Sequence, residues 1–273
     1  MIAVELLKLA RRPRTWMTLL LLDLLPTIVA VLLSVTHIGP RPGQGPAFLS
    51  AVLANGALFA VAALAIVLPL FLPVAVAVVA GDAIAGEAQG GTLRYLLTRP
   101  VGRTRLLVAK LVAVLVFVLV AVVLVSVTGF LVGKLLLGGQ PLPAGTAISS
   151  VSGTLLSPRQ IAIRTVLAIG YVTLSMLGVA ALALLLSTFT DSPIVAALGA
   201  LAFLIGSSLL LTLDAAKALS PYLPTRYWLS FVDLFRDPIL WRNVERGLLL
   251  QLVYLAVFLG AAWANFSTRD ITS

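Results

Sequence analysis

Long uncharged runs alternate along this chain with short charged stretches, and each run is long enough to cross a membrane as a helix. A membrane-spanning helix needs about 20 predominantly apolar residues. We therefore expect an all-α integral membrane protein in which 1–273 form a single transmembrane domain. The pattern predicts six spans, at about 15–36, 47–80, 106–137, 163–190, 193–213 and 247–266.

Two of the apolar runs need a further argument. The run Ala47–Ala80 would be about 50 Å long as one straight helix, against about 30 Å of hydrocarbon core. We expect it to tilt, to project beyond the membrane, or to break near Pro69 and Pro73; if it held two spans, all later segments would change sides. The fourth and fifth spans are separated at Thr190–Pro193, where Ser192 is expected to cap the next helix and Pro193 to occupy its first turn.

Composition agrees with the pattern and excludes several kinds of site. Sixty per cent of the residues are hydrophobic and 11% are charged, whereas a soluble domain carries about 25% charged residues. There is no cysteine, so disulfides and thiolate sites are excluded, and His37 is the single histidine. We assign the net charge of +9 to loops that face anionic lipid rather than to nucleic-acid binding.

Basic residues set the expected orientation, because cytoplasmic loops are enriched in Lys and Arg. The N-terminus and the stretch 86–110 are strongly basic, whereas the loop 36–46 has one Arg. Both termini are thus predicted to be cytoplasmic, with a cytoplasmic loop at 82–105. The segment 214–246 fits less well: it is predicted to be external, with short broken helices, yet it holds five basic and four acidic residues.

The stretch 86–110 carries unusually specific local chemistry for a membrane loop. Gly90 and Gly91 are expected to end the preceding helix, and Thr92 to cap a short new one. An apolar ridge would then lie on one face of that short helix, with Pro100 ending it. The sequence leaves open whether this ridge enters a groove on a partner protein or anchors the loop among lipid head groups. The ridge consists of Leu93, Leu96 and Leu97.

These residues resemble the signature of the ABC-2 type transporter permeases. The resemblance rests on Glu87, Gly91-Thr92-Leu93, Leu96-Leu97, Pro100-Val101, Arg103 and Lys110. It extends to the six-span plan, the broken segment before the last span and the closing Phe266–Ile271. It also covers a basic N-terminal amphipathic helix at about 2–14, with Val4, Leu7 and Ala10 beside Arg11 and Arg14.

The resemblance implies that the loop forms a coupling helix that docks into a separate ATPase subunit. It further implies two ATPase copies and a second permease subunit, identical or different, in a bacterial inner membrane. Glu87 would lie at the lower end of span two, with Arg103 as a possible ion-pair partner. The implied docking residues are Glu87, Gly91, Thr92, Leu93, Arg94, Leu96, Leu97, Pro100 and Arg103.

A search for a phosphate-binding loop agrees with a separate ATPase. The pattern G-x-x-x-x-G-K-[ST] does not occur, since Leu135 follows Gly133-Lys134. We therefore expect this chain not to be an enzyme and to bind no cofactor, with ATP and magnesium held by the partner.

Polar and proline residues within the spans are the candidates for a substrate path or gate. Asp23 lies inside the first span, where a charge costs about 2.5–3.5 kcal/mol, so it is expected to face protein or water. The sequence does not separate a functional role from a structural one. The candidates are Asp23, Pro69, Pro73, Ser207, Ser208 and Thr212.

The leading hypothesis is thus an ATP-driven exporter subunit that moves an amphiphilic, lipid-like, drug or peptide substrate out of the cytoplasm. The alternative is a polytopic membrane anchor or sensor, or a secondary transporter, that engages a cytoplasmic partner without ATP-driven export. An intramembrane enzyme is disfavoured, because Asp23 is the one acid clearly placed inside a span.

Overall fold

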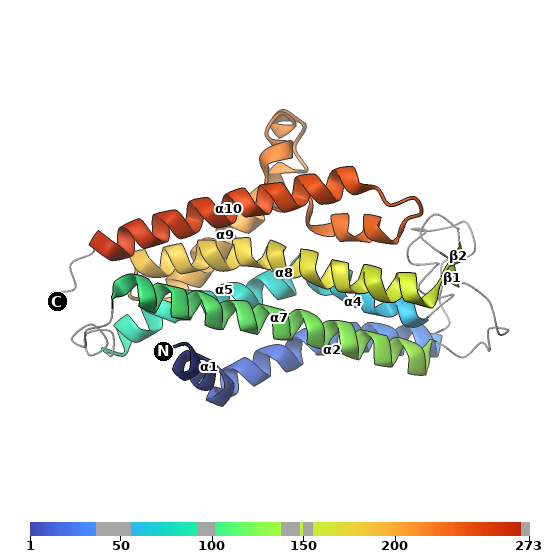
Figure 1. Ribbon diagram of the computed structural model, residues 1–273, viewed down its shortest axis with the longest axis horizontal. Helices are drawn as coiled ribbons and strands as arrows, with labels where there is room; N and C mark the ends of the chain where they lie inside the picture. The colour runs from blue at the N-terminus through green and yellow to red at the C-terminus, as the bar shows by residue number, and fades with distance from the viewer. Residues whose placement is uncertain (37–55, 92–101, 138–147, 150–154, 269–273) are drawn as a thin grey trace.

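The helices of the computed structural model lie side by side along one long axis (Figure 1). The structure describes residues 1–36, 56–91, 102–137, 148–149 and 155–268. Its α-helices are α1 (Ile2–Arg11), α2 (Pro13–Thr36), α4 (Phe59–Val67), α5 (Phe71–Gln89), α7 (Arg103–Leu136), α8 (Pro158–Phe189), α9 (Pro193–Leu210) and α10 (Trp241–Thr268).

Six of these helices are long and apolar enough to cross a membrane, as expected of a multi-pass membrane protein. They are α2, α5, α7, α8, α9 and α10. The prediction of an all-helical chain with six apolar spans is confirmed at this level. Small elements complete the described part: η1 (Gly56–Leu58), η2 (Asp214–Ala216), η3 (Ser220–Tyr222), η4 (Trp228–Phe235), and the antiparallel pair β1 (Ile148–Ser149) and β2 (Leu155–Leu156).

The long second run is broken, and its two helices cross the molecule once. Residues 68–70 form a turn between α4 and α5. The start of α7 contacts the end of α5, where Lys110 binds Glu87, and the end of α7 contacts α4, where Gly129 packs on Ala60. Helices α4 and α5 therefore run together, antiparallel to α7 over its length (Figure 1). This arrangement disfavours two separate spans at 47–80.

Glycine permits the close approach of α7 to α4. A Cβ on Gly129 would lie 2.8 Å from the Ala63 Cβ and 3.1 Å from the Ala60 Cα, and a Cβ on Gly133 would overlap the Gly56 carbonyl and the Phe59 Cβ. Such contacts are the usual result of a G-x-x-x-G spacing in apolar helices.

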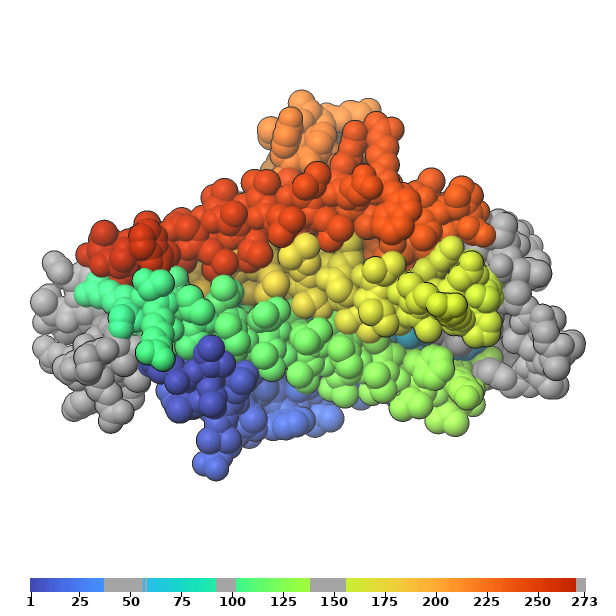
Figure 2. Space-filling view, viewed as in Figure 1, coloured from blue at the N-terminus to red at the C-terminus, as the bar shows by residue number. Residues whose placement is uncertain are grey.

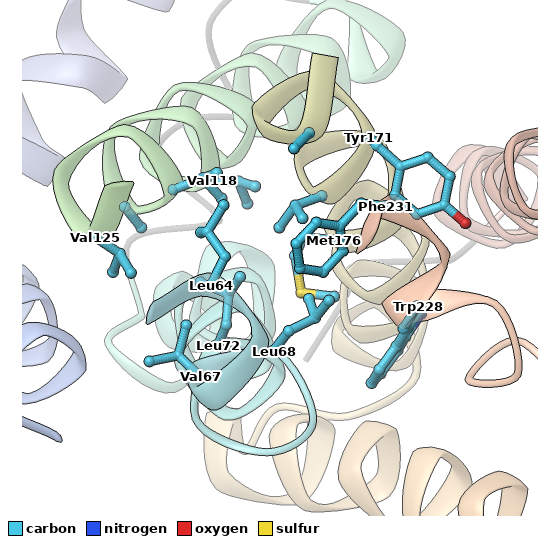
Figure 3. Close-up of a cluster of buried hydrophobic side chains, with 14 of the residues drawn as sticks. Leu64, Val67, Leu68, Leu72, Val118, Val125, Tyr171, Met176, Trp228 and Phe231 are labelled. Carbon is cyan, nitrogen blue, oxygen red and sulfur yellow. The ribbon is translucent and has the colours of Figure 1, made fainter. Parts of the chain in front are cut away.

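The core lies between α4, α5, α7, α8 and η4. Figure 3 shows Leu64 and Leu68 facing Val118, Met176 and Phe231, and each of these side chains is buried. Dispersion and close packing, rather than exclusion of water, hold such helices together if lipid surrounds them.

The segment before α10 is anchored through backbone carbonyls. Tyr171 Oη donates to the Tyr227 carbonyl at 2.6 Å, and the buried Gln251 Nε2 donates to the Pro224 carbonyl at 2.7 Å. The broken helices expected here are three 3₁₀ helices, η2–η4. The orange part of this segment stands out from the side of the bundle in Figures 1 and 2.

Helix capping differs from the prediction at one position. Ser192 occupies the N-cap of α9, with Pro193 in its first turn, but its side chain makes no capping bond. The Thr190 Oγ1 instead accepts the Ser192 backbone N–H at 3.1 Å. A full capping box occurs at α8, where Ser157 and Gln160 bond reciprocally. The S-x-x-Q spacing was available in the sequence as its signal.

Candidate functional site

The basic stretch 86–110 is flanked by two helix ends that lie at the same end of the bundle as the N-terminus (Figure 1). Helix α5 ends at Gln89, and Gly91 has φ +68°, a conformation that glycine adopts without a Cβ clash. The expected helix break is therefore present. Of the predicted docking residues, Glu87, Gly91 and Arg103 are described, whereas Thr92, Leu93, Arg94, Leu96, Leu97 and Pro100 lie outside the described residues.

Four charged side chains meet beside these helix ends, and we call them the four-charge cluster: Glu5, Lys8, Glu87 and Lys110. Lys110 Nζ lies 2.7 Å from Glu5 Oε2 and also binds Glu87. Lys8 Nζ lies 3.1 Å from Glu87 Oε1 and 3.2 Å from Glu5 Oε1. Each cation thus contacts both acids, and the cluster joins α1, α5 and α7.

Burial makes this pairing necessary. Glu5, Glu87 and Lys110 are 7%, 5% and 5% exposed, and a buried charge without a partner costs several kcal/mol. Burial by itself would raise the pKa of Glu5, but hydrogen bonding and charge from Lys110 and Lys8 outweigh it and hold that pKa below its ordinary value. Burial would lower the pKa of Lys8, but the bond to Glu87 leaves it raised. Both shifts favour the charged forms.

A second ion pair fixes the other end of α1. The Arg12 guanidinium binds the Asp82 carboxylate of α5. Helix α1 is consequently held on its inner face by charge, and its apolar residues point elsewhere. Ile2, Val4 and Leu7 are 44%, 56% and 51% exposed, so the apolar stripe expected to lie along the membrane is available to lipid.

Arg103, at the start of α7, binds the end of α10. Its Nη1 donates to the Phe266 carbonyl at 3.2 Å and to the Ser267 carbonyl at 2.9 Å. A cation at these carbonyls satisfies acceptors left free by the helix end and complements its dipole. The sequence proposed Arg103 as a partner for Glu87; the structure pairs Glu87 with Lys110 and Lys8 instead.

The buried Ser187 of α8 binds α5 through hydrogen bonds to residues that precede Glu87. Ser187 Oγ donates to the Gly81 carbonyl at 2.7 Å and accepts the Ala85 N–H at 2.8 Å. It also accepts the Ile84 N–H at 3.2 Å. The end of α5 is thereby held from both sides, by α7 and α1 through charge and by α8 through hydrogen bonds.

The candidates for a substrate path lie in separate environments. Thr128 Oγ1 donates to Asp23 Oδ1 at 2.6 Å, which links α2 to α7. Ser207 bonds Thr225 at 2.8 Å, and Thr212 donates to the Leu209 carbonyl at 2.7 Å. Ser208 and Pro69 are exposed, whereas Pro73 is buried in α5. These contacts give Asp23, Ser207 and Thr212 structural partners, and none of them joins two of the six candidate residues.

Sequence reasoning missed three of the charged residues that organise this region. Glu5, Lys8 and Asp82 gave a weak signal, because each is a single charge at the edge of an apolar run. Among the described residues, no group of three or more His, Asp or Glu side chains could hold a metal ion.

Comparison with protein families gives a match over most of the chain. A family model described as "Protein of unknown function (DUF2705)" matches residues 27–272. A search of curated proteins found no match.

Proposed function

Because the chain belongs to this DUF2705 family, whose description states no activity, we propose a function from the residues themselves: the membrane-spanning permease subunit of an ATP-driven exporter of the ABC-2 type. In this proposal the end of the bundle with both termini is cytoplasmic, and the loop between α5 and α7 forms the coupling helix. Two copies of a separate ATPase and a second permease subunit complete the transporter. The substrate would be amphiphilic, lipid-like, a drug or a peptide.

The observation that supports this most is the way the loop's two flanks are held. The last turn of α5 and the first turns of α7 are joined through Glu87 and Lys110, and α1 binds both through Glu5 and Lys8. A push on the loop would be carried to three helices as a unit, because buried ion pairs resist separation. Arg103 would extend the same displacement to the end of α10.

A mechanism follows from this arrangement. ATP binding would bring the two ATPase subunits together and move the docked loops. The movement of α5 and α7 would then reorient the spans and open a path between the two permease subunits. Residues 68–70 form a turn between α4 and α5. In this mechanism α5 would move relative to α4 at that turn.

The experiment is purification of the tagged chain from its own membranes in mild detergent, followed by mass spectrometry of the bound proteins. We expect an ATPase subunit at about one copy per permease. Replacing Leu93, Leu96 and Leu97 together by Asp should remove it, because the apolar ridge would become charged. Thr98→Asp, in the same loop but off the ridge, is the matched control and should retain the ATPase.

Two outcomes would count against the proposal. Retention of the ATPase by the triple variant would contradict docking through the ridge. Purification with a partner that hydrolyses no ATP would instead favour the membrane anchor or sensor. Export itself needs vesicles that contain both subunits, in which ATPase activity must respond to a transported compound.

A further inference from the structure

A groove of about 380 Å³ opens beside the four-charge cluster, between α2 and α9. Its volume lies within the range of about 300–1,000 Å³ typical of small-molecule sites. Helices α2 and α9 both pack on α5 but have almost no direct contact with one another, so α5 forms the floor between them. We call this space the α2–α9 groove.

The walls of the groove are apolar. Val78 of α5 and Leu198 of α9 are 47% and 59% exposed, and Ile194 is 70% exposed. Val74, Val114 and Leu201 continue the apolar lining. A wall of branched aliphatic side chains favours a hydrocarbon chain over a polar ligand.

The mouth of the groove is charged, with an excess of cations. Four bases, Lys8, Arg12, Arg14 and Lys110, line it together with two acids, Glu5 and Asp82. Lys8 and Lys110 bind Glu5, and Arg12 binds Asp82. Arg14 is exposed and makes no ion pair with another described residue, so its five N–H donors are available to an anion.

The two halves of the groove together define the ligand. A free phosphate would use the cations and leave the aliphatic walls in water, and a neutral lipid would use the walls and leave Arg14 unmatched. An anionic head group on an acyl chain satisfies both, because guanidinium groups bind phosphate oxygens through charge-assisted hydrogen bonds. The cations lie at the end of the bundle that carries both termini, where the head groups of that leaflet would be.

We propose that the α2–α9 groove binds one anionic phospholipid, with its phosphate on Arg14 and an acyl chain along Val78 and Leu198. The inference rests on the proposed function only for the name of the leaflet, the cytoplasmic one. The bound phospholipid would be either the substrate of the transporter or a lipid whose binding affects the position of α1. Its site lies next to the four-charge cluster that holds the flanks of the coupling loop.

Native mass spectrometry of the purified chain tests the proposal with three probes: dioleoyl phosphatidylglycerol, dioleoyl phosphatidylcholine and glycerol phosphate. One phosphatidylglycerol should bind tightly, with weaker binding of phosphatidylcholine and no retention of glycerol phosphate. Arg14→Gln should weaken phosphatidylglycerol binding by about tenfold, as expected for one lost charge-assisted hydrogen bond. Arg14→Lys should retain most of the binding.

Matched variants distinguish binding in the groove from nonspecific attraction by surface charge and from loss of the fold. Arg11→Gln removes an exposed arginine that does not line the groove and should leave binding unchanged. Leu198→Trp should block the acyl chain, whereas Val195→Trp, exposed on the same helix but outside the lining, should not. All five variants should elute like the unsubstituted chain on size exclusion, which checks the fold.

The outcomes of this measurement decide whether the groove binds an anionic phospholipid, and they do not depend on the ATPase. Equal binding of the two lipids, or equal losses in Arg14→Gln and Arg11→Gln, would overturn the proposal. Retention of glycerol phosphate alone would show an anion site without a lipid. Because no ATPase is present in this measurement, a negative result leaves the coupling-helix proposal standing, and loss of the ATPase in the docking test leaves the lipid result standing.

Discussion

Lys110 is the residue on which the four-charge cluster depends. It is 5% exposed and contacts two carboxylates from two other helices. Its position in the sequence, within a long apolar helix, predicts a charge near a membrane interface but not which acids it contacts. The structure adds the reason that this charge is tolerated there: Glu5 and Glu87 surround it.

Replacing Lys110 by Met tests this dependence. The substitution keeps the length of the side chain but leaves Glu5 and Glu87 close together and short of one cation, and breaking a buried pair costs about 3–5 kcal/mol. We expect a clear fall in the Tm of the purified chain in detergent. Lys134→Met, an exposed lysine of the same helix, is the control. Equal Tm values for the two variants would show that the cluster contributes little.

The charge state of Glu5 predicts how α1 responds to acid. Its pKa is lowered on folding, so its contribution is complete above the ordinary value of 4.5 and is lost as the pH falls through the lower folded value. Hydrogen exchange of the α1 amides, corrected for intrinsic rates, should therefore accelerate below about pH 4.5. In Glu5→Gln this acid-dependent acceleration should be largely absent; its full persistence would assign it to another group.

At the scale of helices, apolar runs predicted the spans well because length in a membrane is set by hydrocarbon thickness. The predicted span 193–213 corresponds to α9, Pro193–Leu210, and 106–137 to α7, Arg103–Leu136. Contacts between helices were not predictable in the same way. The inward position of Glu5 and Lys8 and the outward position of Val4 and Leu7 depend on an acid and a base 79 or more residues away.

At the scale of helices, alanine substitutions at two glycines are expected to change the stability of the chain in opposite directions. Alanine at Gly133 would overlap the Gly56 carbonyl and force α7 from η1 and α4, and overpacking costs about 1–3 kcal/mol. Alanine at Gly260 of α10 would meet nothing within 4 Å, and helical alanine gains about 0.5–1 kcal/mol over glycine. Thermal unfolding in one detergent should thus show Gly133→Ala less stable and Gly260→Ala more stable than the natural chain. A change of the same sign in both would contradict this.

At the scale of the whole molecule, each end of the bundle carries both bases that are paired with acids and bases that are not. At the end with both termini, Arg11 and Arg14 extend outward, with no ion pair to another described residue. At the other end, Arg236 bonds Asp233 at 2.8 Å, and Arg164 lies 3.6 Å from Asp237. Bases neutralised by nearby acids within the protein are less available to anionic lipid. Within the segment 214–246, Arg236 is paired in this way, whereas Lys217, Arg242 and Arg246 make no ion pair with a described residue.

This arrangement predicts a specific labelling pattern across the membrane. The natural chain has no cysteine, so each introduced one is a unique target for a membrane-impermeant maleimide. Ala3→Cys and Ser267→Cys, exposed near the two termini, should react in inside-out vesicles and resist labelling in right-side-out vesicles. Arg159→Cys, exposed at the start of α8, should show the reverse, because three crossings separate it from α1. If Ala3→Cys and Ser267→Cys were instead labelled from opposite sides, α4 and α5 would have to form two crossings. The common end of α1, α5, α7 and α10 could then no longer face one partner.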